Sequence, residues 1–459
     1  MRYISTRGGV APVTFSQAVM MGLATDGGLL LPEKIPSVNT ATLIEWSKLS
    51  FADLAKEVIG LFVEQSDIPK ADLDRLIENS FATFDHPDVT PVVKVGDRYI
   101  LELFHGPTLA FKDVALQFLG NLFEHILAQQ GGQLNIVGAT SGDTGSAAIY
   151  GVRGRKGIQI FILHPKGRVS PIQERQMTTV LDDNVHNIAI KGTFDDGQAI
   201  VKQLFNDLDF KKKYQLGAVN SINWARILAQ IVYYFYAWGQ VNKGANQSVT
   251  FSVPTGNFGD IFAGYMAQRM GLPVEKLILA TNRNDILSRF FNTGTYRAGT
   301  VAPTISPSMD IQISSNFERY LYYLLDEDSD KLKSLMAQLD SDGGFSVADK
   351  IMAKTKPLFW ARAVSEEETS ATIKAVYKDD NYILDPHTAV GVCAATGRSE
   401  VICLATAHPA KFGQAVEDAT GRTPDVPKVL QGVMERPTRC LILSASFEAV
   451  RDCMQEVLG

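Results

Sequence analysis

Short apolar runs alternate with segments of helical periodicity from about residue 96 onward. The runs that predict buried strands are Leu134–Val137, Ile158–Leu163, Val185–Ile190, Ser248–Val253, Lys276–Ala280 and Val401–Ala405. Helices are predicted where apolar residues recur at helical spacing, as over Ala115–Leu127 and Ile222–Val241. Strands that alternate with helices are typical of a parallel sheet covered on both faces. The sequence therefore predicts the α/β fold class.

Residues 1–95 have a different pattern, with turn-rich segments, short helical stretches and no strong β run. We predict three domains, in line with a length of 459 residues. These are an N-terminal helical domain over 1–95 and two α/β domains over 96–240 and 241–459. The boundaries are approximate, and an exchange of segments between the two α/β parts stays open. Ser365 and Glu368 have the spacing of a capping box, which predicts a helix start.

The charge balance and the cysteines exclude several classes of protein. With 44 basic and 50 acidic residues, the net charge is −6, which argues against nucleic acid or an anionic membrane as partner. The four cysteines include no CxxC pair and the histidines no HExxH motif, so neither a disulfide framework nor a metal site is expected. The N-terminus lacks the apolar core of a signal peptide, and Ile227–Trp238 is too short to span a membrane. We expect a cytoplasmic protein.

Ligands of parallel α/β sheets bind beyond the carboxyl ends of the strands, which directs attention to three loops, 138–145, 254–260 and 406–409. The loop 254–260, PTGNFGD, opens a predicted helix. Its glycines let backbone N–H groups turn inward, and a helix N-terminus adds positive potential, so the loop can bind a phosphate. It matches neither the P-loop nor GxGxxG. A plain strand-to-helix turn is the alternative.

The loop 138–145, GATSGDTG, also lies between a strand and a helix. Its hydroxyls belong to Thr140, Ser141 and Thr144, and its glycines expose backbone donors. It can bind a carboxylate or a second phosphate, or it can be a tight turn with a helix cap. Two such loops in one sheet indicate ligands with separate anionic groups.

Lys112 stands at the start of a predicted helix, with Phe111 and Val114 close by in the sequence. A lysine in apolar surroundings can lose its proton and attack an aldehyde, although most lysines are solvated surface charges. The reactive role is favoured because the same chain also has a predicted phosphate loop and a hydroxyl-rich loop that can bind a carboxylate. Pyridoxal phosphate requires a Schiff-base lysine, a phosphate site and a partner for its pyridine nitrogen.

The sequence resembles the threonine synthase family of fold-type II pyridoxal-phosphate enzymes, in its longer bacterial and fungal branch. The resemblance covers nearly the whole chain and rests on ordered segments, which are FSQAVMMGLATDGGLLLPEKIP, LELFHGPTLAFKD, ATSGDTG, NSINWARILAQIVYYF, VPTGNFGDIFAG, ATNRND, DPHTAVG and LATAHPAKF. It implies two parallel-sheet α/β domains around a cofactor cleft, preceded by a mainly helical N-terminal domain. It also implies a lyase that converts O-phospho-L-homoserine and water to L-threonine and phosphate, as the last step of threonine biosynthesis.

The resemblance implies a role for each matched residue. Lys112 would bind the cofactor covalently and then move protons, and Thr406 would face the pyridine nitrogen. The cofactor phosphate would bind to Gly256, Asn257, Phe258 and Gly259. The substrate carboxylate would bind to Thr140, Ser141 and Thr144, and the substrate phosphate to Asn220, Ser221, Asn223 and Arg226. Arg226 can equally be a structural ion-pair partner, and His387 and Thr388 are candidates for a lid or, more simply, for helix capping.

Asp143 stands where many fold-type II enzymes have an asparagine near the cofactor's 3′-oxygen. A carboxylate beside a phenolate repels it unless one of the two is protonated. Asp143 therefore either points away or carries a proton and donates a hydrogen bond, and we expect the second arrangement.

Three alternatives stay open. The chain can be another fold-type II lyase, such as a serine or threonine dehydratase, although the Asn220–Arg226 segment and the long N-terminal region argue against that. It can be a catalytically silent relative that only binds the cofactor, although Lys112 is present. A binding module without cofactor explains the sheet but not the three matched loops. A monomer and a homodimer are both compatible with the sequence.

Overall fold

The computed structural model describes residues 1–140, 142–242, 244 and 246–459 of the chain. The described residues group into two compact units. The first unit comprises 1–78, 84–105 and 221–425, and the second comprises 79–83, 106–220 and 426–459. The three domains expected from the sequence stay a prediction; the contacts add that 426–459 packs with 106–220.

The first unit is built on a six-stranded sheet in the order β13-β10-β9-β14-β4-β3. All neighbours in it are parallel except the edge strand β3, which is antiparallel to β4. The strands are β3 Val92–Val95, β4 Arg98–Glu102, β9 Val249–Pro254, β10 Val274–Thr281, β13 Phe359–Ala363 and β14 Ile402–Ala405. Short pairs are formed by β1 Tyr3–Ser5 with β2 Leu30–Pro32 and by β11 Thr295–Arg297 with β12 Gly344–Ser346.

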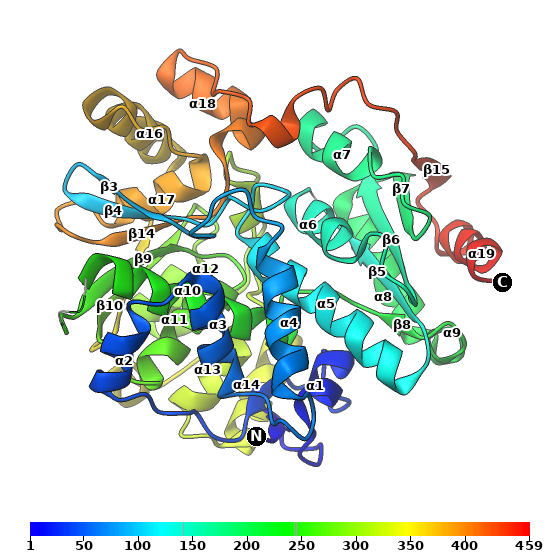
Figure 1. Ribbon diagram of the computed structural model, residues 1–459, viewed down its shortest axis with the longest axis horizontal. Coiled ribbons are helices and arrows are strands. Elements are labelled where there is room, and N and C mark those ends of the chain that lie inside the picture. Colours follow the sequence, from blue (N-terminus) through cyan, green and yellow to red (C-terminus); the bar gives the residue numbers. More distant parts are fainter. Residues whose placement is uncertain (141, 243, 245) are drawn as a thin grey trace. The chain divides into compact units, whose positions relative to one another are not determined.

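Helices cover both faces of this sheet (Figure 1). The helices of the first unit are α1 Phe15–Met21, α2 Thr40–Trp46, α3 Phe51–Gly60, α4 Lys70–Phe81, α10 Trp224–Asn242, α11 Gly259–Arg269, α12 Ile286–Thr293, α13 Phe317–Leu324, α14 Ser329–Asp342, α15 Asp349–Met352, α16 Glu366–Asp380, α17 Pro386–Ala394 and α18 Gly413–Thr420. The last residues of α4 are assigned to the second unit. Short 3₁₀ turns lie at Pro307–Met309 and Pro409–Phe412. The N-terminal helix α3 packs against α10, which explains why residues 1–78 belong to the first unit.

Alternate residues of β10 face opposite layers, as the two-residue period of a strand requires. Ile278 and Ala280 lie in the core cluster that includes α17. Leu277 lies on the other face, where α11 approaches it so closely that a Cβ at Gly264 would be 3.1 Å from the Leu277 side chain. The sheet is therefore buried on both faces. Within the described residues, even α10 lacks the apolar character that a membrane-spanning helix needs.

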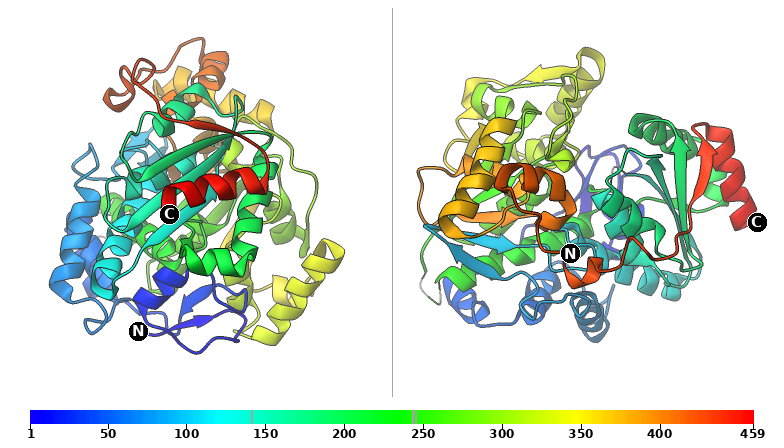
Figure 2. Two further views of the ribbon diagram at one scale, coloured as in Figure 1. Left: turned by 90° about the vertical axis from the view of Figure 1, so that its right-hand side faces the viewer. Right: turned by 90° about the horizontal axis from the view of Figure 1, so that it is seen from above.

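The second unit contains a five-stranded sheet in the order β15-β7-β6-β5-β8, and every pair in it is parallel. The strands are β5 Leu134–Ala139, β6 Ile158–Pro165, β7 Val185–Lys191, β8 Leu216–Gly217 and β15 Leu441–Ser444. The helices are α5 Lys112–Gln130, α6 Asp143–Val152, α7 Pro171–Thr178, α8 Phe194–Asn206, α9 Leu208–Lys213 and α19 Phe447–Leu458, with a 3₁₀ turn at Lys428–Leu430. The C-terminal helix α19 packs beside α8 on one face of the sheet (Figure 2).

The predicted α/β class with parallel sheets is confirmed, and each predicted strand is present with bounds shifted by at most a few residues. The structure adds strands that the sequence analysis missed. β1, β2 and β8 have three residues or fewer, which is too short to show an alternating pattern. β15, with the four-residue sequence LILS, was also missed, and its residues are mostly exposed.

Candidate functional site

Lys112 is the first residue of α5 in the second unit, and only 8% of it is exposed. Its Nζ lies 3.8 Å from Oδ2 of Asp143 and 5.7 Å from the ring centre of Phe111. An amine in this position has both an apolar ring and a carboxylate as neighbours. The predicted apolar surroundings of Lys112 are therefore present, and the carboxylate partner is new.

The loop before Lys112 is fixed by the next residue, Asp113. The backbone N–H and the hydroxyl of Thr108 donate to its two carboxylate oxygens at 2.8 and 2.6 Å. Gly106 is required beside it, because a Cβ there would lie 2.4 Å from the Asp113 Cβ. Gln176, a residue of α7, donates from its Nε2 to the Thr108 carbonyl at a distance of 3.2 Å. Side chains that hold the loop in this way fix where α5 begins, and so fix the origin of the lysine side chain.

Asp143 is the first residue of α6 and is buried. Gln173 Nε2 donates to its Oδ1 at 2.7 Å, while Oδ2 faces Lys112. Gly142 has a φ of 145°, and a Cβ there would be 2.6 Å from the Gln173 amide carbon, so only glycine fits. Asp143 therefore points toward the lysine rather than away from it. The proton expected on its carboxyl stays a prediction.

The hydroxyl of Thr140 is occupied by its own loop, because it accepts the N–H groups of Gly142 and Gly145 at 3.0 and 2.9 Å. Thr144 follows Asp143 in α6 and is half-buried. Asn220 is exposed, and Ser141 lies outside the described residues. The loop that was expected to bind a carboxylate is thus held in shape by a threonine hydroxyl.

The predicted phosphate loop lies in the first unit, between β9 and α11, whereas the loop 138–145 follows β5 in the sheet of the second unit. The expectation that the two loops belong to one sheet was therefore wrong. Among the described residues, the backbone N–H groups of Asn257, Phe258 and Gly259 have no acceptor. The first turn of a helix leaves such donors unpaired and adds positive potential, which suits an anion. Gly256 is packed so tightly that a Cβ would lie 3.0 Å from the Ser308 carbonyl oxygen. The loop therefore has the donors and the close packing that phosphate binding needs.

Phe258 anchors this loop. Its φ is 63°, in the left-handed region that a phenylalanine rarely adopts, and it precedes the first residue of α11. Its buried ring packs against other aromatic rings, at centre-to-centre distances typical of aromatic pairs. These rings belong to Phe291, Phe317, Tyr320 and Phe359. The packing holds the loop backbone in this left-handed conformation.

A segment that the sequence analysis missed, Ser314–Asn316, holds the same loop from the other side. Ser314 Oγ donates to the carbonyl of Gly256 at 2.5 Å, and Ser315 Oγ donates to Oδ1 of Asn257 at 3.0 Å. The backbone N–H of Asn316 donates to the Asn257 carbonyl at 3.0 Å. Backbone and side-chain acceptors of the loop are thus satisfied by this segment, which leaves the N–H groups of the loop for a ligand.

The same segment reaches Ser221, one of the predicted substrate-phosphate residues. The hydroxyls of Ser221 and Ser315 are 2.7 Å apart, and Asn316 Nδ2 donates to the Ser221 carbonyl at 3.2 Å. Arg319 is fully buried and donates to the carbonyls of Ile222 at 2.6 Å and Leu30 at 2.9 Å. Ser221 and Asn257 are therefore brought together through Ser315.

Asn223 and Arg226 are both buried in the first unit. The Asn223 side chain donates to the Val19 carbonyl at 2.8 Å and accepts the Ala225 N–H at 3.1 Å, which gives it a role in starting α10. Burial lowers the pKa of Arg226 to about 10, and the nearby Tyr233 opposes that shift. A guanidinium in such surroundings interacts strongly with an anion because water screens it little. Its predicted part in phosphate binding stays a prediction.

Thr406 directly follows β14 and is buried. β14 is parallel to β9, with Cys403 opposite Ser252, so Thr406 and Thr255 leave the sheet at the same edge. The sheet thus brings Thr406 beside the predicted phosphate loop, in the manner expected for strand-exit loops.

His387 and Thr388 lie in the first turn of α17, where the carboxylate of Asp385 caps the helix. Asp385 accepts both backbone N–H groups at 2.9 and 3.1 Å, together with the Thr388 hydroxyl. The Nδ1 of His387 lies 2.7 Å from Asp385, and its Nε2 accepts the Ser308 N–H at 3.1 Å. Asp385 is thus the cap of α17, and His387 and Thr388 are the residues that donate to it. His387 also supports the Ser308 turn that packs on Gly256.

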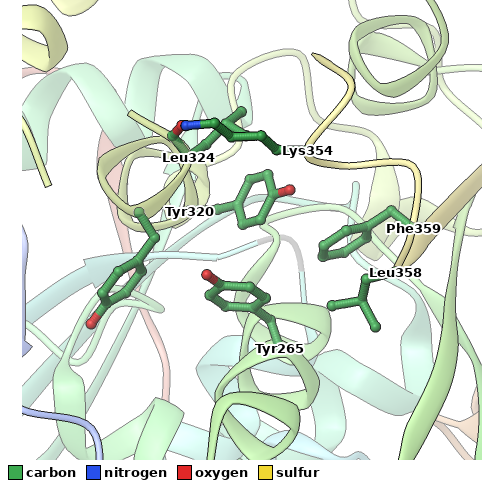
Figure 3. Close-up of a pocket in the computed structure, with 7 residues that line it drawn as sticks. Tyr265, Tyr320, Leu324, Lys354, Leu358 and Phe359 are labelled. Carbon is green, nitrogen blue, oxygen red and sulfur yellow. The ribbon is translucent and has the colours of Figure 1, made fainter. Parts of the chain in front are cut away.

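A separate pocket in the first unit is lined by aromatic residues (Figure 3). Its lining residues are Tyr265, Tyr320, Tyr323, Leu324, Lys354, Leu358 and Phe359. Its volume of about 100 Å³ is well below the roughly 300–1,000 Å³ of typical ligand sites. Lys354 is paired with Asp326 at 2.7 Å. The pocket contains none of the predicted site residues, and we assign it no ligand.

The donor groups fit pyridoxal phosphate. A buried lysine at a helix start can attack its aldehyde, free N–H groups at the start of α11 can hold its phosphate, and Thr406 offers a hydroxyl. A metal is not required by this set. Within residues 1–140, 142–242, 244 and 246–459, three or more His, Cys, Asp or Glu side chains are nowhere grouped as metal ligands.

Several of these contacts were missing from the sequence analysis. Asp113, Gln173 and Asn316 lie on helices or loops that no strand-exit rule selects. Polar residues inside an apolar helix are a further signal, and α10 contains Gln230, Tyr233 and Tyr234 in addition to the predicted Arg226. That signal would have drawn attention to α10 as a functional helix.

Comparison with protein families gives three matches. Residues 2–81 match the model described as "Threonine synthase N terminus", and residues 388–454 match "Threonine synthase, C-terminal". Residues 89–337, more than half of the chain, match "Pyridoxal-phosphate dependent enzyme". The matched ranges contain Lys112, the phosphate loop and Thr406.

Similar proteins cover nearly the whole chain. A threonine synthase of Pseudomonas aeruginosa is 50% identical over 458 residues, 98% of this chain and 97% of its own. One of Saccharomyces cerevisiae is 53% identical over 444 residues, 89% of this chain and 86% of its own. The structure of PLP-bound threonine synthase from Brucella melitensis superposes with a TM-score of 0.97 at 47% identity, covering 100% of this chain and 99% of that one. The chain belongs to the threonine synthase family of pyridoxal-phosphate-dependent enzymes.

Proposed function

We propose that the chain converts O-phospho-L-homoserine and water to L-threonine and phosphate, by elimination at Cγ followed by addition of water at Cβ. The similarity to threonine synthases over nearly the full length supports this reaction above that of a dehydratase. The observation that carries the proposal is the pairing of Lys112 with Asp143 at the start of two helices, in a chain that also has a free phosphate loop.

Pyridoxal phosphate, when bound, withdraws electrons from the substrate carbons and makes their protons acidic. Lys112 is the residue that moves these protons. Its flexible side chain can reach Cα, Cβ and Cγ in turn, so that one base serves all three carbons. Asp143, whose Oδ2 lies 3.8 Å from the Lys112 Nζ, keeps the lysine side chain directed.

The other predicted site residues bind and orient the cofactor and the substrate. Gly256–Gly259 hold the cofactor phosphate through backbone N–H groups, and Thr406 faces the pyridine nitrogen as a neutral partner. The substrate carboxylate binds to Thr140, Ser141 and Thr144, and the substrate phosphate binds to Asn220, Ser221, Asn223 and Arg226. Because the substrate has two anionic groups, two such sets fix its direction as well as its position. The buried guanidinium of Arg226 supports its part in this set.

The decisive experiment is turnover by the purified protein with pyridoxal phosphate and O-phospho-L-homoserine. We expect threonine and phosphate in equal amounts, and Lys112→Ala is expected to form neither. Serine in place of the phosphorylated substrate separates the two enzyme classes. Release of ammonia from serine without threonine from the phosphorylated substrate would replace the proposal with a dehydratase, and absence of all products would remove it.

We infer a cytoplasmic location and a monomer or homodimer without nucleic acid as partner. The four cysteines Cys393, Cys403, Cys440 and Cys453 are all free thiols, which fits a reducing compartment. The net charge of −6 argues against nucleic acid. Light scattering coupled to gel filtration measures the oligomeric state, and a mass above two chains would contradict the inference.

A further inference from the structure

Asp260 is a buried carboxyl group in the first turn of α11, directly after the phosphate loop. It is only 7% exposed. Its Oδ1 accepts the hydroxyls of Tyr233 at 2.5 Å and Tyr234 at 3.0 Å, and Tyr234 also donates to its backbone carbonyl at 2.9 Å. Its Oδ2 is buried and has no hydrogen-bond partner among the described residues. A carboxylate oxygen without a donor is costly to bury, whereas a neutral carboxyl group is much less so.

No basic group among the described residues balances this carboxyl. From α10, the helix most closely packed on α11, only the two tyrosines face it, and Arg226 acts on Tyr233 rather than on Asp260. From α13, Glu318 pairs with Arg7 and Arg319 donates to backbone carbonyls and to Asn316.

From β10, Glu275 and Lys276 lie near the amino end of the strand, away from the start of α11. Burial accordingly raises the pKa of Asp260 to about 7, against a smaller opposing effect of the two tyrosine hydroxyls.

The N–H groups of Asn257, Phe258 and Gly259 precede Asp260 along the same turn. A dianionic phosphate bound there would lie within about one helical turn of the carboxyl, and both would compete for the positive end of one helix. We propose that Asp260 is a positioning residue of the cofactor-phosphate loop, which takes up one proton from solvent as the phosphate binds. The proton adds to a carboxylate oxygen, and no other bond changes. The loop then holds a single anion, the ligand.

This inference rests on the proposed role of Gly256–Gly259 in cofactor binding, and its test needs no turnover. The dissociation constant of pyridoxal phosphate is measured on the apoprotein from pH 6 to 9 for the wild type, Asp260→Asn and Asp330→Asn. Asp330 is the matched control, because it is also the second residue of its helix but its side chain is 91% exposed. Dividing the wild-type values by those of Asp260→Asn removes the titrations of the cofactor and of Lys112.

We expect the ratio of wild-type to Asp260→Asn dissociation constants to be flat below pH 7 and to rise toward tenfold per pH unit above it. Asp330→Asn is expected to follow the wild type. A constant ratio across the range would overturn the inference while leaving the cofactor site intact. Failure of all three proteins to bind pyridoxal phosphate would instead overturn the proposed cofactor site.

Tyr233→Phe provides a second test if Asp260→Asn does not fold. It removes a hydroxyl that stabilises the carboxylate, so the bend in the wild-type pH profile is expected to move to higher pH. Phosphorus NMR of the bound cofactor, read at the same pH values, shows whether its phosphate stays dianionic. An unmoved bend in Tyr233→Phe, or a bend that follows the phosphorus titration, would overturn the inference.

Discussion

The buried carboxyl group of Asp260 affects stability as well as ligand binding. Its pKa is about 7 in the folded chain and near 3.8 when exposed, so the folded state keeps a proton that the unfolded state loses. The stabilisation is complete below about pH 4 and is lost as the pH rises to about 7. The difference between the two pKa values corresponds to about 4 kcal/mol. We expect Asp260→Asn to lack this pH-dependent loss of stability. The free energy of unfolding in urea, measured from pH 4 to 8, checks this.

The comparison of the two proteins is made as a difference of free energies of unfolding at each pH. The other titrating groups contribute equally to the wild type and to Asp260→Asn, so their contributions cancel in the difference. Equal pH slopes for the two proteins between pH 4 and 7 would show that Asp260 is ionised in the folded chain throughout this range.

Gly256 gives a second prediction at the level of one residue. A Cβ there would lie 3.0 Å from the Ser308 carbonyl oxygen and 3.1 Å from the Met309 Cα, both of them backbone atoms that cannot move aside cheaply. We expect Gly256→Ala to cost about 1–3 kcal/mol of stability and to weaken pyridoxal phosphate binding at least tenfold. Gly413→Ala is the control, because nothing lies within 4 Å of its Cβ position. Thermal unfolding and cofactor titration measure both effects; equal values for the two variants would contradict the packing argument.

Single residues were predictable from the sequence where the chemistry demands one residue type. Only a lysine supplies the amine at the helix start, and only glycines let the loop backbone approach a phosphate closely. The partners were not predictable, because Gln173 and Asp113 are ordinary polar residues whose importance comes from what they contact. Only the folded chain brings Gln173 to Asp143 from 30 positions away.

At the level of elements, the segment Ser314–Asn316 links two loops. Asn316 is its most connected residue, with its Nδ2 donating to the carbonyls of Ser221 and Asn257 at 3.2 Å and its Oδ1 accepting from the buried Arg319. We expect Asn316→Ala to cost about 2–3 kcal/mol, since it leaves buried polar groups unsatisfied. It should also weaken pyridoxal phosphate binding about tenfold through the displaced loop, the equivalent of about 1.4 kcal/mol.

Asn292→Ala is the control for this prediction. Asn292 is part of α12 in the same unit and makes one 3.3 Å bond to the Ala361 carbonyl, so its loss is expected to cost less than about 1 kcal/mol. Chemical unfolding and cofactor titration are compared for both variants. If Asn316→Ala binds the cofactor as tightly as Asn292→Ala does, the segment supports the fold alone.

Elements with strong local signals were predicted well. The buried strands β5, β6, β7, β9, β10 and β14 appear as expected, and the capping box of Ser365 and Glu368 starts α16 with both bonds formed. The edge strands β3, β13 and β15 were missed. β13, FWARA, mixes apolar residues with an arginine, whereas β3, VVKV, and β15, LILS, are mainly apolar but only four residues long. Ser314–Asn316 has no regular structure, so no periodicity could mark it.

At the level of the whole molecule, the C-terminal segment completes the second unit. β15 pairs with β7, and α19 buries Val450 and Met454 in the core cluster of that sheet. Truncation after Cys440 removes both elements and exposes the cluster. We expect a clear fall in the melting temperature of the truncated protein. We also expect proteolysis to cleave 106–220 faster than 221–425, as measured by mass spectrometry of the fragments. Removal of Gly459 alone is the control, and equal cleavage rates in the two ranges would contradict the prediction.

The division of the chain into units was the hardest feature to predict. Hydrophobic patterning is local, whereas the return of 426–459 to the strands of 106–220 is a contact between distant segments. The α/β class needed only the alternation of strands and helices. Which strands share a sheet depends on crossovers that the sequence does not mark, and β4 between β14 and β3 is an example.

The pairing of β15 with β7 also orders events during synthesis. Leu441 follows Lys191 by 250 positions, which a ribosome covers in roughly 10–50 s at about 5–20 residues per second. During that time β7 has an unpaired edge and its sheet lacks the cover of α19, a situation that favours aggregation or chaperone binding. The sheet of the second unit therefore depends on β15 and α19 for protection, although its other strands are translated long before them.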